Sequence, residues 1–261
     1  MSEAPAIAVL GLGEAGSAIA ADLVRGGASV VGFDPARQAP DGVEGMPDAR
    51  AAAESADVVL SVTSAPVALE IAETVAPVLA EGRLFADLNT AAPALKRELA
   101  GVVERSGAGF ADVALLRGVS DWGIGTPSLV SGSGAERFAE TFRRLGMPVT
   151  VVGPAAGEAA ARKLARSVFM KGLAAAVGEA LAAGERLGCE DWLRPDIEAT
   201  LTGADARLLR RLVEGSRTHA ARRVEEMAAA VAMLEELGVE PRVAAASEAW
   251  LRSLAESGVP R

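Results

Sequence analysis

The sequence predicts an α/β fold, in which a mostly parallel sheet is followed by an all-helical region. Up to about residue 153, short β-branched runs alternate with longer amphipathic stretches, a pattern typical of right-handed β-α-β units. Beyond this point the strand pattern stops and only helical periodicity continues. We therefore expect one domain over residues 1–153 and an all-helical domain over residues 154–261.

The expected elements follow from these periods and from the breaks between them. The predicted strands are Ile7–Leu10, Ser29–Phe33, Asp57–Val62, Leu84–Asp87, Phe110–Ala114, Ser128–Ser131 and Val149–Val152. The helices predicted among them are Ala15–Arg25, Ala65–Ala80, Ala94–Arg105 and Ala135–Leu145. The later helices are Ala155–Leu187, Asp191–Leu201, Ala204–Val213, Ser216–Leu237 and Arg242–Ser257, with Pro195, Gly203, Gly215 and Gly238 as expected breaks.

Composition excludes several classes of protein. The formal net charge is −9 without any block of lysine or arginine, which argues against nucleic acid and anionic membranes as partners. No apolar run reaches the roughly 20 residues that span a bilayer, and the first residues lack the basic segment of a signal peptide. A single cysteine, Cys189, suits a reducing compartment, so we expect a cytoplasmic protein. With one histidine and one cysteine far apart, we expect no metal site.

The stretch AVLGLGEAGSAIAADL is typical of a dinucleotide-binding loop, because it follows a predicted strand and opens a predicted helix. In this pattern Gly11 permits a tight turn, Gly13 lets the backbone approach a pyrophosphate, and Gly16 lets the helix pack on the strand. The free N–H groups at the start of the helix would hold the phosphates in place of basic side chains. Alone, the pattern is weak, since glycine loops also occur as plain turns.

The second predicted strand strengthens the prediction. It ends in SVVGFDP, which places Asp34 18 residues after Gly16, close to the roughly 20 expected for an acid that binds the ribose hydroxyls. A carboxylate there favours NAD over NADP because it repels a 2′-phosphate. The simpler interpretation is that Asp34 only starts an Asp-Pro turn. Arg37, three residues on, could hold a 2′-phosphate, so NADP stays possible.

A nicotinamide enzyme that acts on an alcohol carbon needs a group that accepts or supplies the hydroxyl proton. Lysine can do this, whereas arginine cannot because it does not deprotonate. Only three of the 26 basic residues are lysines, and Lys163 lies just past the expected domain boundary. We take Lys163 as the first candidate and Lys171 as the second; the alternative is that both are surface lysines.

The residues above give the chain a resemblance to the β-hydroxyacid dehydrogenase family, which includes 3-hydroxyisobutyrate dehydrogenase and 6-phosphogluconate dehydrogenase-like proteins, with imine reductases as relatives. GLGEAGSAIAADL resembles the family's opening glycine block, and ADLNTAAP resembles its D-x-S-T-x-x-P loop. GPAAGEAAARKLARS resembles G-x-x-G-x-G-x-x-x-K-x-x-x-N, and DVVLSVTSAPVALEI resembles the strand and loop that pass the cofactor. The resemblance covers nearly the whole chain and is greatest to a less characterised branch with HAARRVEEM.

The resemblance implies a Rossmann-type domain that binds NAD(P), followed by a helical domain for substrate binding and homodimerisation. It makes Lys163 the general acid and base. The residues that it places at the cofactor are Gly11, Leu12, Gly13, Glu14, Ala15, Gly16, Asp34, Val62, Thr63, Asn89 and Thr90.

The turn that holds the substrate carboxylate departs from the family pattern. Its serine and first glycine are Leu116 and Arg117 here, and the asparagine that follows the catalytic lysine is replaced by Ser167. Arg117 or Arg166 could clamp a carboxylate or phosphate with a planar pair of donors, or could be an ordinary surface arginine. The candidates for substrate binding are therefore Leu116, Arg117, Gly118, Arg166, Ser167 and His219.

We expect an NAD(P)-dependent oxidoreductase that moves a hydride between a nicotinamide and a small, anionic hydroxy acid. Two alternatives stay open. One is imine reductase-like reduction of C=N bonds, and the other is a dinucleotide-binding protein that has lost its substrate turn and its catalytic activity. The identity of the substrate, the direction of the reaction and the oligomeric state do not follow from the sequence.

Overall fold

The structure, a computed structural model, describes residues 5–257. The chain divides into two compact units between Arg166 and Ser167, and this division falls inside the long helix α7 (Glu158–Leu187). The expectation of a mostly parallel sheet followed by an all-helical region is confirmed.

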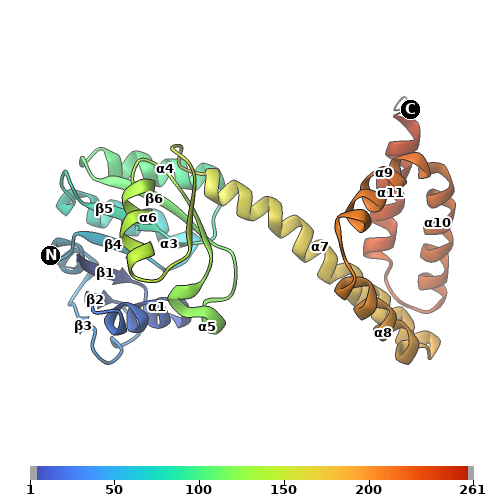
Figure 1. Cartoon of the computed structure of the whole chain (residues 1–261), viewed down its shortest axis with the longest axis horizontal. Helices are drawn as coiled ribbons and strands as arrows, with labels where there is room; N and C mark the ends of the chain where they lie inside the picture. Colours follow the sequence, from blue (N-terminus) through green and yellow to red (C-terminus); the bar gives the residue numbers. More distant parts are fainter. Residues whose placement is uncertain (1–4, 258–261) are drawn as a thin grey trace. The chain divides into compact units, whose positions relative to one another are not determined.

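The first unit contains an eight-stranded sheet in the order β3-β2-β1-β4-β5-β6-β7-β8 (Figure 1). All neighbouring strands are parallel except β6 and β7, which are antiparallel. The strands are β1 (Ala6–Leu10), β2 (Ser29–Phe33), β3 (Glu44–Gly45), β4 (Val58–Ser61), β5 (Leu84–Asp87), β6 (Gly109–Leu115), β7 (Ser128–Ser131) and β8 (Val149–Gly153).

Helices cover both faces of this sheet. The helices of the first unit are α1 (Glu14–Arg25), α2 (Ala49–Glu54), α3 (Ala65–Val75), α4 (Pro93–Glu104), α5 (Val119–Trp122) and α6 (Ala135–Arg144), with short 3₁₀ turns at Ala76–Val78 and Gly123–Gly125. α1 and α6 bury Ile19, Phe138 and Phe142 against one face, and α2, α3 and α4 cover the other. The central strands are therefore buried on both sides, as their almost continuous apolar sequences require.

Three elements of the first unit were not predicted. β3 contains only two residues and α2 only six, which is too short for a recognisable period, and α5 is a single turn. The predicted strands and the other helices are present, with ends that differ by a few residues.

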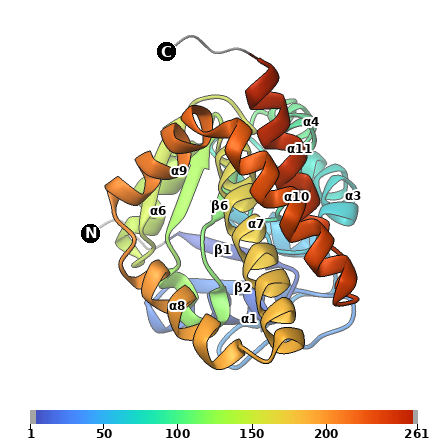
Figure 2. The same ribbon diagram turned by 90° about the vertical axis from the view of Figure 1, so that its right-hand side faces the viewer.

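The second unit consists of the end of α7 and of α8 (Glu190–Thr202), α9 (Ala206–Thr218), α10 (Ala220–Glu236) and α11 (Arg242–Glu256). Figure 2 shows α10 and α11 side by side. Their small buried core contains Ala183, Leu234 and Ala244. The start of α11 is held by α7, because the Glu179 carboxylate accepts hydrogen bonds from the backbone N–H groups of Val243 (2.7 Å) and Ala244 (2.8 Å).

Two expected helix breaks in this unit were wrong. Pro195 lies inside α8, and the break between α9 and α10 falls at His219 instead of Gly215. Gly215 lies inside α9, because a glycine within a helix costs only about 1 kcal/mol and does not by itself end it. Nearby, the guanidinium of Arg223 donates to Ser216 Oγ at 2.6 Å.

Among the described residues, α7 is one helix whose length and composition would suffice to cross a membrane. Its most apolar stretch has a mean hydropathy of 1.2, and 11% of that stretch is buried. This differs from our expectation that no apolar run is long enough. The difference arises because alanines interspersed with larger apolar residues raise the mean hydropathy, even though Lys171 and Glu179 interrupt the run.

We expect Glu179→Ala to lower the free energy of unfolding of the helical unit by about 1–3 kcal/mol, because two N–H groups at the start of α11 lose a charged acceptor. Chemical denaturation followed by circular dichroism measures this change. Glu185→Ala, at an exposed position of the same helix, is the matched control. Equal stability of the two variants would contradict the role of Glu179 as a cap.

Candidate active site

A cleft of about 390 Å³ lies at the carboxyl ends of β1 and β4. The strand order reverses between these two strands, since β2 and β3 lie on one side of β1 and β4 to β8 on the other. Open α/β sheets bind ligands at this point, because the loops diverge there to opposite faces. The residues that line the cleft are Leu10, Gly11, Gly13, Phe33, Asp34, Pro35, Val62, Thr63, Ser64, Val67, Glu70 and Ile71.

The three glycines of the loop are required for different reasons. Gly11 has φ +94°, and a Cβ there would lie 2.4 Å from the carbonyl oxygen of Val62. A Cβ on Gly16 would lie 1.8 Å from the carbonyl oxygen of Gly11, so only glycine lets α1 pack this closely. A Cβ on Gly13 would meet no atom within 4 Å, and its φ of −63° suits any residue. The protein itself does not need glycine at position 13, which fits a backbone that a ligand approaches closely.

The start of α1 is open to an anion. Gly13 caps the helix without any side-chain hydrogen bond, so the first N–H groups lack a partner from a capping side chain. Glu14 is exposed, and Ala15 packs on the core at the start of the helix. This arrangement fits a dinucleotide whose phosphates lie on the helix N-terminus.

Asp34 lies in the cleft and also has a structural role. Its Oδ1 accepts from the N–H of Ala36 at 2.9 Å, as in a turn that an aspartate starts, and its Oδ2 accepts from the N–H of Leu12 at 2.8 Å. The second bond ties the end of β2 to the glycine loop. The side chain of Leu12 is buried in the core, so this residue contributes its backbone to the site.

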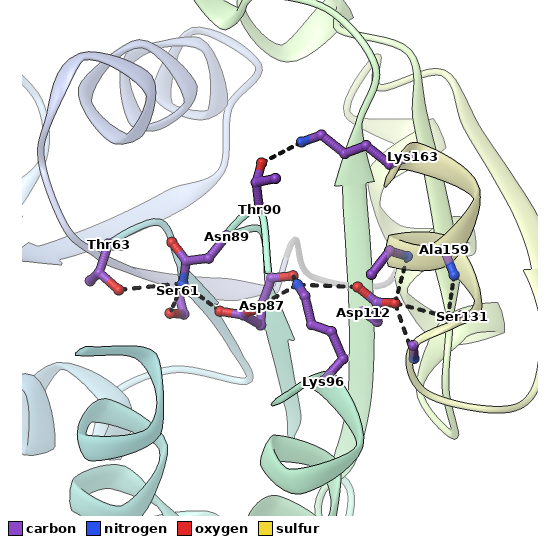
Figure 3. Close-up of polar contacts among 12 residues, drawn as sticks. Ser61, Thr63, Asp87, Asn89, Thr90, Lys96, Asp112, Ser131, Ala159 and Lys163 are labelled. Atoms are coloured by element: carbon purple, nitrogen blue, oxygen red, sulfur yellow. Dashed lines mark hydrogen bonds and ion pairs between the residues drawn. The ribbon is translucent and has the colours of Figure 1, made fainter. Parts of the chain in front are cut away.

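Four buried residues, Ser61, Asp87, Asp112 and Ser131, form what we call the polar row. They are register partners on the successive strands β4, β5, β6 and β7, and each side chain is fully buried. Two carboxylates side by side on neighbouring strands repel each other. Lys96 of α4, 1% exposed, offsets this repulsion: its Nζ lies 2.7 Å from Asp87 Oδ2 and 3.1 Å from Asp112 Oδ1 (Figure 3).

The polar row holds two further parts of the site. On one side, Asn89 donates from Nδ2 to Asp87 Oδ1 at 2.5 Å, to Ser61 Oγ at 3.0 Å and to Thr63 Oγ1 at 3.3 Å. Thr63 lines the dinucleotide cleft, so Asn89 connects this cleft with the row.

On the other side, Asp112 Oδ2 accepts from the N–H groups of Gly157 (3.1 Å) and Ala160 (3.0 Å) at the start of α7. Ser131 Oγ accepts from the N–H of Ala159 at 3.0 Å. The carboxylate lies at the positive end of the helix dipole, where a negative charge is favoured.

Lys163 lies one turn into α7, and its Nζ donates to Thr90 Oγ1 at 2.7 Å (Figure 3). The amine thereby reaches the loop that follows β5. A crevice too tight for a water molecule lies between the two; the residues that line it are Asn89, Thr90, Ala91, Asp112, Val113, Ala114, Ala160, Lys163 and Leu164. The proton-transfer candidate and the cofactor candidates Asn89 and Thr90 therefore share one crevice.

The residues that replace the family's substrate turn lie near the same helix. Arg166, one turn after Lys163, donates from Nη1 to the carbonyl oxygen of Leu116 at 3.2 Å. The guanidinium of Arg117 lies over the ring of Trp122, 4.5 Å from its centroid, in a cation–π contact. Gly118 begins α5. Both arginines are exposed and keep donors available for an anion.

Three other candidates belong to the second unit. Ser167 is its first residue, Lys171 is exposed on α7, and His219 is exposed at the junction of α9 and α10. Within residues 5–257 no group of three or more histidine, cysteine, aspartate or glutamate side chains is arranged to hold a metal ion.

The sequence analysis missed Lys96 and the two carboxylates that it joins. The signal was present: Lys96 lies on the same face of α4 as the buried Leu99, Ala100 and Val103, where a solvated lysine does not belong. Asp112 likewise interrupts the apolar strand β6.

The fold and the cleft define a nucleotide-binding α/β protein of the Rossmann type. Residues 6–153 match the family described as the NAD binding domain of 6-phosphogluconate dehydrogenase, and this match covers more than half of the chain. The chain therefore belongs to this family, and the expectation of an NAD-binding domain is confirmed. Residues 185–254 match a domain of unknown function.

Relatives agree with this assignment. The chain is 28% identical to a 3-hydroxyisobutyrate dehydrogenase from Pseudomonas aeruginosa over 212 residues, which cover 76% of this chain and 70% of the relative. A solved conserved hypothetical protein from Sinorhizobium meliloti is 31% identical, with a TM-score of 0.64 over 96% of this chain and 88% of that one. An imine reductase from Myxococcus stipitatus in complex with NAD+ is 24% identical and shares the fold, with a TM-score of 0.82 over 98% and 95% of the two chains.

We expect Gly13→Ala and Gly16→Ala to separate ligand binding from folding. Gly16→Ala forces its Cβ against the carbonyl oxygen of Gly11 and should cost about 3 kcal/mol of stability or more. Gly13→Ala should leave stability within about 0.5 kcal/mol of the wild type, because its Cβ enters open space, and should weaken NADH binding. Thermal unfolding and NADH titration measure the two effects. NADH affinity that Gly13→Ala leaves unchanged would contradict the close approach of the ligand.

Proposed function

We propose that the protein is an NAD(P)-dependent oxidoreductase that acts on a small, anionic hydroxy acid, with Lys163 as general acid and base. The observation that carries this proposal is the 2.7 Å bond from Lys163 Nζ to Thr90 Oγ1. This bond brings the Lys163 amine to the crevice with Asn89, which is bonded in turn to Thr63 of the dinucleotide cleft, and this position supports a role in proton transfer.

When bound, a nicotinamide supplies the group that accepts or donates the hydride. The chain supplies the remaining functions. The glycine loop and the start of α1 would bind the diphosphate. Asp34, whose two oxygens already accept from backbone N–H groups, would accept the ribose hydroxyls with its remaining lone pairs. The carboxylate of Asp34 favours NAD, because it would repel a 2′-phosphate, while the exposed Arg37, three residues on, could favour NADP.

Lys163 accepts the hydroxyl proton when the alcohol is oxidised and returns it when the carbonyl is reduced. The hydroxyl of Thr90 holds Lys163 Nζ at the crevice. Nζ can replace this hydrogen bond with one to the substrate oxygen. Arg166 and Arg117 are suited to the substrate's anionic group, since a guanidinium binds a carboxylate with two parallel hydrogen bonds. Leu116, which stands where the family has a serine, favours an apolar substituent beside this group.

The second candidate function is reduction of C=N bonds. It is favoured by the loss of the serine and glycine that hold a carboxylate in the hydroxyacid enzymes. It is disfavoured by Lys163, because a lysine at this position is the pattern of the hydroxyacid branch. A panel of hydroxy acids with NAD and of cyclic imines with NADPH, followed at the nicotinamide absorbance band, distinguishes the two functions.

We further propose that the protein works as a homodimer through its helical unit. This unit exposes large apolar side chains, among them Val168, Phe169, Trp192, Leu209 and Trp250, around a small core. Exposed apolar side chains of this size, where they adjoin, are typical of a surface that a partner covers. A second copy is the occupant that the family resemblance implies.

We expect Lys163→Met to lower kcat by about 10²–10⁴-fold, because the reaction loses its general acid and base while the thioether keeps the shape of the stem. NADH affinity should stay nearly unchanged. Stopped-flow or steady-state assays on the substrate found in the panel, with NADH titration beside them, measure both quantities.

Lys171→Met is the competing variant and should keep its turnover. Loss of turnover in Lys171→Met together with normal turnover in Lys163→Met would assign the catalytic role to Lys171 instead. Tight NADH binding by the wild type without turnover of any acid or imine would instead favour the non-catalytic dinucleotide-binding protein.

We expect light scattering to give a mass near twice that of the chain. Phe169→Glu and Trp192→Glu should shift the protein toward the monomer, because each places a charge on the apolar surface. A monomeric wild type that sediments with phospholipid vesicles would overturn the dimer and assign the apolar surface of α7 to a membrane.

A further inference from the structure

Lys96 is a buried cation that the proposed chemistry does not use. It is 1% exposed and does not line either the dinucleotide cleft or the crevice of Lys163. It touches the site only through Asp87 and Asp112, the two carboxylates of the polar row. Burying a lysine and two carboxylates costs desolvation free energy that apolar side chains would not cost. The cluster lies beside the candidate site, so a role in that site would explain it.

The first consequence of this arrangement concerns the direction of the Asn89 amide. Lys96 occupies Asp87 Oδ2, which leaves Oδ1 as the acceptor that faces Asn89. A carboxylate only accepts hydrogen bonds, so the amide has to present its nitrogen. The Asn89 carbonyl oxygen then points away from the row, as Figure 3 shows. Turned the other way, it would face the Asp87 oxygen and Nδ2 would lose three acceptors.

The second consequence concerns α7. Lys96 faces Asp112 Oδ1, while the other oxygen accepts from the N–H groups of Gly157 and Ala160. The same carboxylate therefore binds the cation of α4 and the first turn of the helix that bears Lys163. Asp112 Oδ1 makes no hydrogen bond within the described residues, so the charge of Lys96 is what compensates it.

We propose that Lys96 is a positioning residue for the dinucleotide and proton-transfer site. Through Asp87 it fixes Asn89 with its carbonyl oxygen toward the ligand, as an acceptor for an N–H or O–H group at the nicotinamide end of the dinucleotide. Through Asp112 it fixes the first turn of α7 and hence the backbone position of Lys163. The part that concerns Asn89 rests on the proposed function, whereas the part that concerns α7 does not.

The variant that tests this is Lys96→Met combined with Asp87→Asn. Lys96→Met alone leaves two adjacent buried carboxylates without a cation and is expected to fold poorly. The pair removes one cation and one anion, so the net charge of the cluster stays the same. The new amide at position 87 offers donors as well as an acceptor, which frees Asn89 to turn. Arg105→Met, at the exposed end of α4, is the control for removal of a basic residue from this segment.

We expect the pair to unfold cooperatively and to bind NADH about 3- to 10-fold more weakly than the wild type, the effect of one hydrogen bond. In an Asn89→Ala background the pair should cost no further affinity, because its effect passes through Asn89. NADH titrations of the wild type, the pair, Asn89→Ala and the combination of the pair with Asn89→Ala form a double-mutant cycle that measures this. Wild-type affinity of the pair, or a loss that multiplies with that of Asn89→Ala, overturns the role of Lys96 in directing Asn89.

Amide hydrogen exchange of the free protein tests the second part without any cofactor. The N–H groups of Gly157, Ala159 and Ala160 should exchange about threefold faster or more in the pair than in the wild type, because the turn opens more easily. Exchange at the wild-type rate overturns the link to α7. Failure of the wild type to bind NADH would overturn the proposed function, and this exchange measurement would then decide the inference.

Discussion

The site depends on how the protein accommodates two carboxylates that lie side by side inside its sheet. Asp87 and Asp112 are register partners on β5 and β6, fully buried, and would repel each other without compensation. The ammonium group of Lys96 on α4 and the N–H groups at the start of α7 supply the compensating positive charge from opposite sides. The strands β5 and β6, the helix α4 that connects them and the start of the more distant helix α7 are thereby fastened at one point of the sheet. The crevice of Lys163 lies against this point, so its geometry follows from the balance of these charges.

A second constraint is that an acidic protein has to bind an anionic ligand. The net charge is −9, yet the cleft contains no cluster of basic side chains among its lining residues. The backbone supplies the attraction instead, through the uncapped start of α1 and a glycine whose Cβ would meet nothing. Short-range dipoles of this kind act only on a group that reaches them. The general surface can therefore stay negative without weakening the site.

The glycine loop and its cleft could be predicted from the sequence because the pattern is local: strand, turn and helix follow one another within twenty residues. The sheet and the helical unit were predicted for a similar reason, since their periods extend over whole segments. The place of Lys96 on the apolar face of α4 indicated burial, but its partners could not be assigned because they lie on the strands β5 and β6. Gly215 was expected to end a helix, but the helix continues through it. Tertiary contacts decided the first of these cases.

The division between the two units falls four residues after Lys163, inside a continuous helix. Lys163 therefore belongs to the nucleotide-binding unit, as does Thr90, which accepts its hydrogen bond. Changes from Ser167 onward would leave the start of α7 and the Lys163 amine attached to the sheet, because Asp112, Ser131 and Thr90 all belong to the first unit. The helical unit can therefore diverge in sequence without altering the contacts that hold this amine.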